Sequence, residues 1–542
     1  MTTQLEECKM PYTINNVTAY NPLHNAVGKV PEKKIKKYID RLSYNKFLFE
    51  DTNGNKKLCF KKYITLVDYV KYLIGKYKPE EIEKLPSVDN NCNNKFEKYI
   101  NSQHNYAYVD GYFYYLTSKL LEHGFVHGLD YYDNYVCIAN NCEINIADDF
   151  EYLADSNFFN ENINKLFKFK DDTFGQMFKK NVAVSISEEN VPLLTESLDE
   201  LDGIETLDVD TLSYEVLDNE PNTQSDIIIE DLTVDNESIP DSDHSTVDLS
   251  DDEPDQLVNT NGDRLSNESS EWGTDEEDEE FEDDELDQVT LVIDKIPTQV
   301  IAIECCDTTF DSILEDNEIR IEELESAMFQ VIAMLYLYQQ VFKFTHNDLH
   351  TNNIMCINTE EEFLYYKILG KYYKIPTYGR IYKIIDFGRS IYTVNNVLLC
   401  SDSFSENGTA NTQYNCEPFL NPEKPVIEPN YSFDLCRLAC SMVDFIVEDM
   451  RDINQYRKSV PVYDLIISWL YDDNGVNILY KKNGEERYPD FKLYKMIARI
   501  VHNHTPEKQF DHVCFKKYET DTANIALDKC MDLEKIKSQV HL

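Results

Sequence analysis

Apolar residues recur at helical spacing in two long stretches of this chain. Residues 322–342 carry an apolar side chain every three or four positions, which is the period of one face of an α-helix. Residues 105–123 show the same spacing and are followed by Gly124, a residue type that commonly ends helices. We therefore predict a helix over each stretch, and the chain after residue 433 reads as mostly helical as well.

Shorter apolar runs predict β-strands. Residues 46–50 and 57–61 flank the polar residues 51–55, which include Gly54, so this region predicts a strand, a turn and a second strand. Further apolar runs of strand length lie at residues 131–139, 299–303 and 381–385. Helices and strands in this mixture indicate an α+β fold.

One segment breaks this pattern because it is almost entirely polar and acidic. Residues 188–287 hold 38 Asp and Glu against a single basic residue, Arg264, which gives a net charge of −37. Charge repulsion and low apolar content leave nothing to offset the entropy cost of ordering, so we predict a disordered insertion. It is either a solvated spacer or a docking arm for basic partners. As an arm it would be tuned by phosphorylation of serines beside acids, such as Ser242, Ser250, Ser269 and Ser270.

The rest of the chain is only mildly acidic. Subtracting −37 from the total of −49 leaves a net charge of −12 for the other residues. This disfavours direct nucleic-acid binding, which calls for a basic face. The 14 Cys form no C-x-x-C pair with zinc-finger spacing, and no apolar run reaches the ~18 residues of a membrane span. Because a signal peptide is also missing, we predict reduced thiols and a cytosolic protein without a membrane segment.

The densest chemical signal is a polar loop that follows the predicted helix at 322–342. The loop reads H-x-D-x-x-x-x-N, with Asp348 and Asn353 as its functional residues, and a D-F-G motif begins at Asp386. Phosphoryl transfer from ATP needs a carboxylate that accepts the proton of the attacking hydroxyl. It also needs oxygen ligands that hold Mg²⁺ on the phosphates. Asp348 suits the first role, and Asn353 and Asp386 suit the second.

These motifs resemble those of eukaryotic-type protein kinases, and in particular the divergent serine/threonine kinases of large DNA viruses. His350 resembles the haspin-like branch, and residues 413–418 and 429–436 are similar to further kinase segments. The resemblance implies a two-lobed protein-kinase-like fold and transfer of the ATP γ-phosphate to serine and threonine hydroxyls with Mg²⁺. It also implies ATP and protein substrates, including basic proteins, as partners. The expected location is the host cytoplasm, and packaging in the virion is left open.

On this resemblance the chain divides into five parts. Residues 1–187 are the first part of an N-lobe, residues 188–287 the acidic insertion, and residues 288–306 the last N-lobe strand and the hinge. Residues 307–519 are the C-lobe, and residues 520–542 are a polar tail.

The resemblance also assigns a lysine that contacts the ATP phosphates. The sequence from Leu58 to Lys61 is similar to V-A-I-K, which makes Lys61 the candidate. Lys61 is preferred to Lys62 because it shares a strand face with the small residue Cys59. Asp110, on the helix predicted at 105–123, is the acid expected to pair with this lysine.

Further expectations concern the same site. Glu304 and Cys306 of the hinge are expected to offer backbone groups to adenine. His350 is a candidate catalytic residue near the transferred phosphate, as a pH-dependent substitute for Lys, and a structural loop histidine fits it equally well. Asp434 is expected to anchor the backbone of the catalytic loop, and His346 is expected to hold that loop in place.

The chain also departs from the kinase pattern. Asn347 stands where kinases usually carry the Arg that binds a phosphorylated activation loop, so we expect constitutive activity. Gly28 and Gly54 are the only glycines before residue 61, so the usual Gly-rich loop is missing and a loop around residues 25–30 is expected to cover the nucleotide. These departures leave two alternatives open. One is a pseudokinase or virion scaffold protein, and the other is a small-molecule phosphotransferase.

Overall fold

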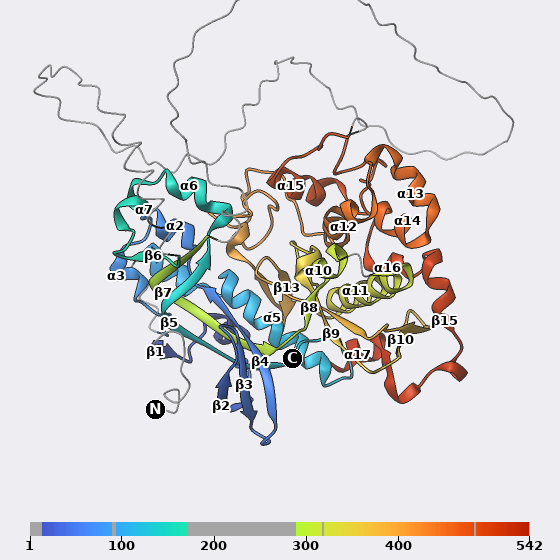
Figure 1. Cartoon of the computed structure of the whole chain (residues 1–542), viewed down its shortest axis with the longest axis horizontal. Coiled ribbons are helices and arrows are strands. Elements are labelled where there is room, and N and C mark those ends of the chain that lie inside the picture. The colour runs from blue at the N-terminus through green and yellow to red at the C-terminus, as the bar shows by residue number, and fades with distance from the viewer. Residues whose placement is uncertain are drawn as a thin grey trace, which may run out of the picture. The chain divides into compact units, whose positions relative to one another are not determined.

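The computed structural model describes residues 14–88, 94–171, 175, 289–316, 319–481 and 484–540. The chain divides into one compact unit, made of Met1–Lys180 and Phe281–Leu542, and a second unit, Asn181–Glu280. The described residues all belong to the first unit, so the insertion predicted at 188–287 lies outside them. The described unit is a mixed α+β structure (Figure 1).

The N-terminal half of this unit is built on a 7-stranded sheet in which all paired strands are antiparallel. The strand order is β1-β5-β7-β4-β3-β2, and β6 pairs with β7. The strands are β1 (Ile14–Thr18), β2 (Ile35–Arg41), β3 (Lys46–Asp51), β4 (Lys56–Thr65), β5 (Tyr131–Asn145), β6 (Phe167–Phe169) and β7 (Thr290–Glu304). The helix α5 (Tyr106–Leu121) packs against β5 and β7 (Figure 1).

Short helices fill the connections of this half. They are α1 (Pro22–Val27), α2 (Tyr69–Leu73), α3 (Pro79–Ile82), α4 (Lys95–Ile100), α6 (Phe150–Ala154) and α7 (Asn157–Asn162). Of these, α1 packs against α5, where the rings of His24 and Tyr112 lie 5.6 Å apart.

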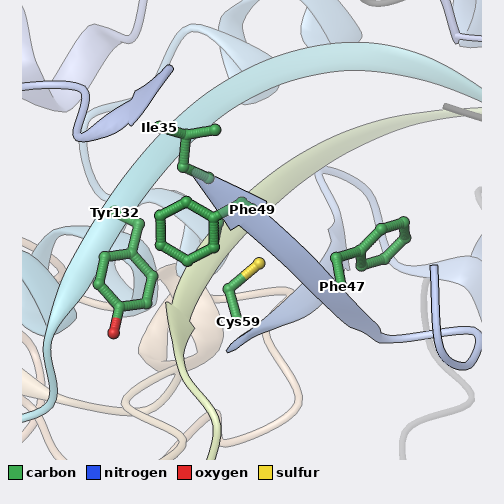
Figure 2. Close-up of a cluster of buried hydrophobic side chains, with 6 residues drawn as sticks. Ile35, Phe47, Phe49, Cys59 and Tyr132 are labelled. Atoms are coloured by element: carbon green, nitrogen blue, oxygen red, sulfur yellow. The ribbon is translucent and has the colours of Figure 1, made fainter. Parts of the chain in front are cut away.

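A buried apolar cluster fixes which way the residues of β4 face. Its members in Figure 2 are Ile35, Phe47, Phe49, Cys59 and Tyr132. Ala302 of β7 completes the cluster and pairs with Lys61 across the sheet. Because side chains alternate between the two faces of a strand, Cys59 and Lys61 lie on the cluster side, and Lys62 lies on the opposite side.

The C-terminal half is mainly helical around α11 (Ile321–Phe342), which is buried along most of its length. Further helices of this half are α10 (Phe310–Glu315), α12 (Phe433–Ile446), α13 (Ile453–Ser459), α14 (Pro461–Ser468), α15 (Phe491–Ile500), α16 (Pro506–Gln509) and α17 (Leu533–Gln539). Among these, α14 and α16 pack against α11, and α15 packs against α12 (Figure 1).

Strands in this half frame the loops that carry the sequence motifs. The strands are β8 (Thr308–Thr309), β9 (Ile354–Asn358), β10 (Phe363–Ile368), β11 (Lys371–Pro376), β12 (Arg380–Ile384), β13 (Ile391–Val394) and β14 (Val397–Cys400). Three of them form a small sheet in the order β12-β9-β8, while β10 and β11 form a hairpin.

The predicted helices and strands are largely confirmed. The helix predicted at 105–123 is α5, and the one predicted at 322–342 is α11. The predicted strand-turn-strand is β3 and β4, joined at Gly54 with a left-handed φ of 86°. The strands β5 and β7 are longer than predicted because they pair with each other along their whole length, and this pairing extends them past their apolar runs.

The polar tail predicted for residues 520–542 is wrong where the structure describes it. The short β15 (Glu519–Thr520) is followed by β16 (Cys530–Asp532) and α17 (Leu533–Gln539), and β16 pairs in parallel with β10. Met531, Leu533 and Ile536 are buried. Because β16 passes directly into α17, neither the two-residue period of a strand nor the helical period of about 3.6 residues continues for long. The hydrophobic pattern therefore did not reveal these two elements.

Over the described ranges, no helix is both long and apolar enough to span a membrane.

Candidate active site

The two sequence motifs lie side by side because β9 and β12 are paired. Asn353 directly precedes β9, and Asp386 lies just after the end of β12. Ile354 is opposite Ile384 in this pair, and the N–H of Ile385 donates to the carbonyl of Asn353 at 2.9 Å. The pairing therefore places the two predicted Mg²⁺ ligands at adjacent strand ends.

Asp434 fixes the backbone of the loop that carries Asp348. It lies fully buried in the first turn of α12 and accepts hydrogen bonds from the N–H groups of His346 and Asn347 at 2.9 and 2.8 Å. Burial raises the pKa of Asp434 to about 7, although the two N–H groups work in the other direction. The predicted contact of Asp434 with this loop is confirmed.

His346 connects the two motifs through both nitrogens of its buried ring. Its Nε2 donates to the carbonyl of Ile385 at 2.9 Å, and its Nδ1 accepts from the N–H of Asp348 at 3.3 Å. These partners define a neutral ring with the proton on Nε2. Burial lowers the pKa of His346 and so favours this neutral form. His346 holds the loop, as the sequence predicted.

The side chain of Asn347 is buried and forms hydrogen bonds with other residues of the protein. Its backbone is left-handed, with a φ of 66°, and its buried amide donates to the carbonyl of Arg389 at 2.9 Å and to the hydroxyl of Thr345 at 3.1 Å. Its side-chain oxygen accepts from the hydroxyl of Tyr414 at 2.8 Å. Asn347, which stands in place of the usual Arg, therefore connects the loop before Asp348 to the segment after Asp386 through uncharged hydrogen bonds. Constitutive activity stays a prediction.

Lys62 is the lysine that reaches the motifs. Its ammonium lies 3.0 Å from a carboxylate oxygen of Asp110 on α5 and 3.0 Å from Oδ1 of Asp386. The other oxygen of Asp110 accepts from the N–H of Phe387 at 2.5 Å. The ring of Phe387 packs against Phe113 of α5, with the ring centres 4.6 Å apart. One buried carboxylate thus joins β4, α5 and the D-F-G segment.

These three charges shift one another's protonation. Burial raises the pKa of Asp110 to about 6, although the Lys62 ammonium works against this shift. Desolvation alone would raise the pKa of Asp386, but Lys62 outweighs it and lowers that pKa to about 2. Desolvation of Lys62 is likewise outweighed by the two carboxylates, which hold its pKa well above the usual value. Lys62 therefore favours the charged form of both carboxylates, and the carboxylates favour the charged form of Lys62.

The assignment of Lys61 as the phosphate-contacting lysine is corrected by the faces of β4. Lys61 is completely buried on the cluster side, with its ammonium 3.8 Å from the ring centre of Tyr38 and 4.3 Å from that of Phe47. Asp110 does pair with a lysine of this strand, as predicted, but that lysine is Lys62. A shift of one residue exchanges the two faces of a strand, so two adjacent lysines look alike in sequence.

Asn353 and His350 contact each other. The amide of Asn353 donates to the carbonyl of Asp348 at 2.9 Å and lies 3.1 Å from Nε2 of His350. Within the described residues, the side-chain oxygen of Asn353 accepts no hydrogen bond. Burial lowers the pKa of His350, which favours a neutral ring at neutral pH. His350 therefore fits a structural loop histidine better than a cationic substitute for Lys.

Both carboxylate oxygens of Asp348 have partners that the sequence did not indicate. The hydroxyl of Tyr494 on α15 donates to Oδ1 at 2.7 Å, and the guanidinium of Arg389 lies 3.4 Å from Oδ2. Nε of Arg437 donates to the same Tyr494 hydroxyl at 2.9 Å. These residues come from three separate stretches of sequence and belong to no motif, so no sequence signal marked them.

In the predicted hinge, Glu304 makes its contacts with other residues of the protein. The N–H of Glu304 donates to the carbonyl of Asp130 at 2.8 Å, and its carboxylate pairs with the buried Lys383 at 2.7 Å. Cys306 is buried, and no described residue accepts a hydrogen bond from its N–H. The N–H and side chain of Glu304 therefore serve the fold, whereas the N–H of Cys306 is the hinge donor that could meet a ligand.

Two oxygens of this site fit Mg²⁺. Asp386 has half of its side chain exposed (50%), and only its Oδ1 is paired with Lys62. The side-chain oxygen of Asn353 is the second candidate, as described above. Across the described ranges, no group of three or more His, Cys, Asp and Glu is arranged to hold a metal. Mg²⁺ suits such a sparse site, because it usually takes one or two protein ligands and completes its shell with phosphates and water.

The segment near residues 25–30, which is expected to cover the nucleotide, lies at the end of helix α1 and just after it. Asn25 belongs to α1, which ends at Gly28 with a left-handed φ of 69° and packs against α5. The turn that borders the lysine strand joins β2 to β3, where Asn45 exchanges hydrogen bonds of 2.7 Å with the backbone N–H and carbonyl of Lys61. The β2–β3 turn therefore lies beside the strand that carries Lys61 and Lys62.

No family model matches this chain, and no curated protein matches it either.

Replacing Asp434 with asparagine should destabilise the protein by about 1–3 kcal/mol, because an amide nitrogen cannot accept from the second buried N–H group. The loss should depend on pH. Burial raises the pKa of the native Asp434 carboxyl to about 7 from an ordinary value of 3.8, so the native state binds the proton more tightly than the unfolded state. The stabilisation that comes from the protonated Asp434 carboxyl is fully present below the unfolded pKa of 3.8. It is lost as the pH rises through the native pKa of about 7.

Denaturant unfolding across this pH range checks the Asp434 prediction. The wild type should unfold with a larger free energy than Asp434→Asn, and this difference should shrink as the pH rises from 3.8 to about 7. Asp444→Asn, an exposed position of the same helix, is the matched control. A stability difference that stays constant with pH would show that the Asp434 carboxyl does not titrate in this range.

Proposed function

We propose that this chain is a Mg²⁺- and ATP-dependent protein kinase that phosphorylates serine and threonine hydroxyls. The observation that carries the proposal is the convergence of Lys62, Asp110 and Asp386 beside a loop held by Asp434 that presents Asp348. An antiparallel sheet on which α5 packs, followed by a mainly helical half, also suits the two-lobed kinase-like fold. A viral origin and a cytoplasmic location remain part of this proposal.

Each residue of the convergence has a chemical role in this proposal. The ammonium of Lys62, held by Asp110, would bind the phosphates of ATP as a fixed positive charge. Asp386 and the side-chain oxygen of Asn353 would hold Mg²⁺, which neutralises charge on the phosphates when bound. Asp348 would orient the acceptor hydroxyl and take up its proton. Asp434 and His346 position Asp348 through the loop backbone.

Two alternative functions use the same site. The occupied oxygens of Asp348, together with the missing Gly-rich loop, favour a pseudokinase or scaffold protein that binds nucleotide without transferring phosphate. A small-molecule phosphotransferase would use the same groups around ATP but a different acceptor.

Phosphate transfer from radiolabelled ATP tests the three functions together. The purified full chain should label a serine-containing protein in the presence of Mg²⁺, and chelation of Mg²⁺ should abolish labelling. Asp348→Asn, prepared in the same way, controls for a contaminating kinase. Nucleotide binding without labelling of any acceptor would support the scaffold function, and labelling of small hydroxyl compounds alone would support the third function.

The proposal makes a separate prediction for Asp386. Asp386→Asn should lose the stabilisation that Mg²⁺-ATP gives the wild type, which is about 2.7 kcal/mol at a hundred-fold excess over Kd. The variant also leaves Lys62 with one counter-charge fewer, so ATP without Mg²⁺ should bind it at least as well as the wild type. Thermal unfolding with each nucleotide form measures both effects. An unchanged response to Mg²⁺-ATP would remove Asp386 from the metal site.

A further inference from the structure

Tyr494 marks the place of an acceptor hydroxyl. Its phenolic O–H donates to Oδ1 of Asp348 at 2.7 Å, which is the contact that a serine or threonine hydroxyl would make under the proposed function. Tyr494 lies on α15, which packs against α12 (Figure 1). The surface of α15 next to Tyr494 therefore borders Asp348.

This border is rich in positive charge. The guanidinium groups of Arg389 and Arg437 lie 5.6 and 5.1 Å from the ring centre of Tyr494. Arg437 is half-buried, and no described carboxylate pairs with it. Desolvation works against this charge, but Tyr494 and the nearby Asp348 outweigh it and raise the pKa of Arg437, so the side chain stays cationic and can attract an anionic ligand.

The positive charge continues along α15. This helix carries Lys492, Lys495 and Arg499 and contains no Asp or Glu. None of the three forms an ion pair with a described residue. Desolvation and the neighbouring Arg499 lower the pKa of Lys495, so these cations repel one another with no carboxylate to offset the repulsion.

Arg499 extends this surface to the segment downstream of Asp386. Its guanidinium donates to the carbonyl of Thr412 at 2.8 Å. Thr412 has a left-handed φ of 68°, a strained conformation that β-branched residues rarely adopt. Because Arg499 supports this strained backbone, it has a structural role as well as a charge.

We propose that Arg389, Arg437, Lys492, Lys495 and Arg499 form a cationic acceptor surface, and that it binds an acidic, serine- or threonine-containing segment of a substrate protein. The inference rests on the proposed function in its assignment of Asp348, and it names the substrate class of that same site. Acidic residues around the acceptor supply counter-charge to Lys492, Lys495 and Arg499, which form no ion pair with a described residue, whereas Arg389 already lies beside Asp348. The seated hydroxyl takes the place of the Tyr494 hydroxyl on Asp348.

The acceptor O–H gives its proton to Asp348 as its oxygen bonds to the γ-phosphorus of ATP. The bond between that phosphorus and the oxygen bridging the β- and γ-phosphates breaks, and ADP leaves with the electron pair.

Binding can be tested without catalysis. A fluorescent peptide with one serine among glutamates should bind the full chain more weakly as salt rises, because exposed charges are screened beyond about 8 Å at physiological ionic strength. The double variant Lys492→Glu with Lys495→Glu should weaken its binding at least about tenfold, or about 1.4 kcal/mol. Lys535→Glu with Lys537→Glu on α17 makes the same charge change elsewhere and should leave binding unchanged.

A peptide with one serine among lysines is the second control. It can bind acidic parts of the chain, so its binding should not weaken in the α15 variant. The milder pair Lys492→Gln with Lys495→Gln keeps the test valid if the charge reversal unfolds the protein, and denaturant unfolding checks both pairs. Equal loss of acidic-peptide binding in the α15 and α17 variants would overturn the proposal.

Phosphorylation separates this inference from the proposed function. The acidic peptide should be labelled with a lower KM than the basic one, and the α15 variant should raise that KM. Binding without labelling of any acceptor would retain the surface and reject the kinase. Efficient labelling of basic peptides alone, or of only the chain's own serines, would support the kinase activity. It would overturn the inference that the substrate is an acidic segment of another protein.

Discussion

Asp348→Asn should lower kcat by about a hundred- to ten-thousand-fold, the usual contribution of a positioned general base. Asparagine keeps an oxygen that can accept from the Tyr494 hydroxyl, so the contact with α15 survives. It also keeps the backbone N–H that donates to His346. It loses the capacity to take up a proton and the charge beside Arg389, neither of which contacts the nucleotide in this proposal, so the effect should fall on kcat with the KM for ATP nearly unchanged.

Steady-state kinetics with the best peptide acceptor measure this effect. Mg²⁺-ATP should raise the melting temperature of Asp348→Asn as much as that of the wild type, which shows that the nucleotide site is intact. Asp444→Asn on α12 is a matched control for the chemical change at an exposed position. If Asp348→Asn keeps more than about a tenth of the wild-type kcat, a different group takes up the proton.

The sequence predicted the parts of this site that lie close together along the chain. The loop from His346 to Asn353 and the D-F-G segment each read as a motif, and the pairing of β9 with β12 brings them together. Asp434 was also predicted, because its surroundings resemble a kinase segment, and it contacts the loop as expected. Local motifs suffice when the residues that touch each other lie within them.

The sequence did not predict the contacts that depend on strand faces and helix packing. Tyr494 of α15 contacts both Asp348 and Arg437 because α15 packs against α12, and neither helix position stands out in sequence. The choice between Lys61 and Lys62 depended on which face of β4 meets α5. The small Cys59 suggested the wrong face, because it packs in the apolar cluster of Figure 2. Such choices are made by tertiary packing, which outweighs local residue type.

Lys62→Met should abolish phosphate transfer and strongly weaken the binding of Mg²⁺-ATP, whereas Lys61→Met should leave both nearly unchanged. The two changes remove one charge each from adjacent positions of β4, so they form a matched pair. Lys62 contacts Asp110 and Asp386, while Lys61 is enclosed by the rings of Tyr38 and Phe47. Sequence alone predicted the reverse order, so this comparison tests the structure directly.

Loss of folding is the main competing explanation for an inactive Lys62→Met, because the change leaves Asp110 buried without its counter-charge. Breaking a buried pair in this way costs about 3–5 kcal/mol, and denaturant unfolding would reveal it. Asp110→Asn supplies the needed comparison, since it keeps Lys62 beside Asp386 and leaves an oxygen for the N–H of Phe387. Activity should then fall in the order wild type, Asp110→Asn, Lys62→Met. An inactive Lys61→Met that still unfolds cooperatively, beside an active Lys62→Met, would show that the face of β4 has been assigned wrongly.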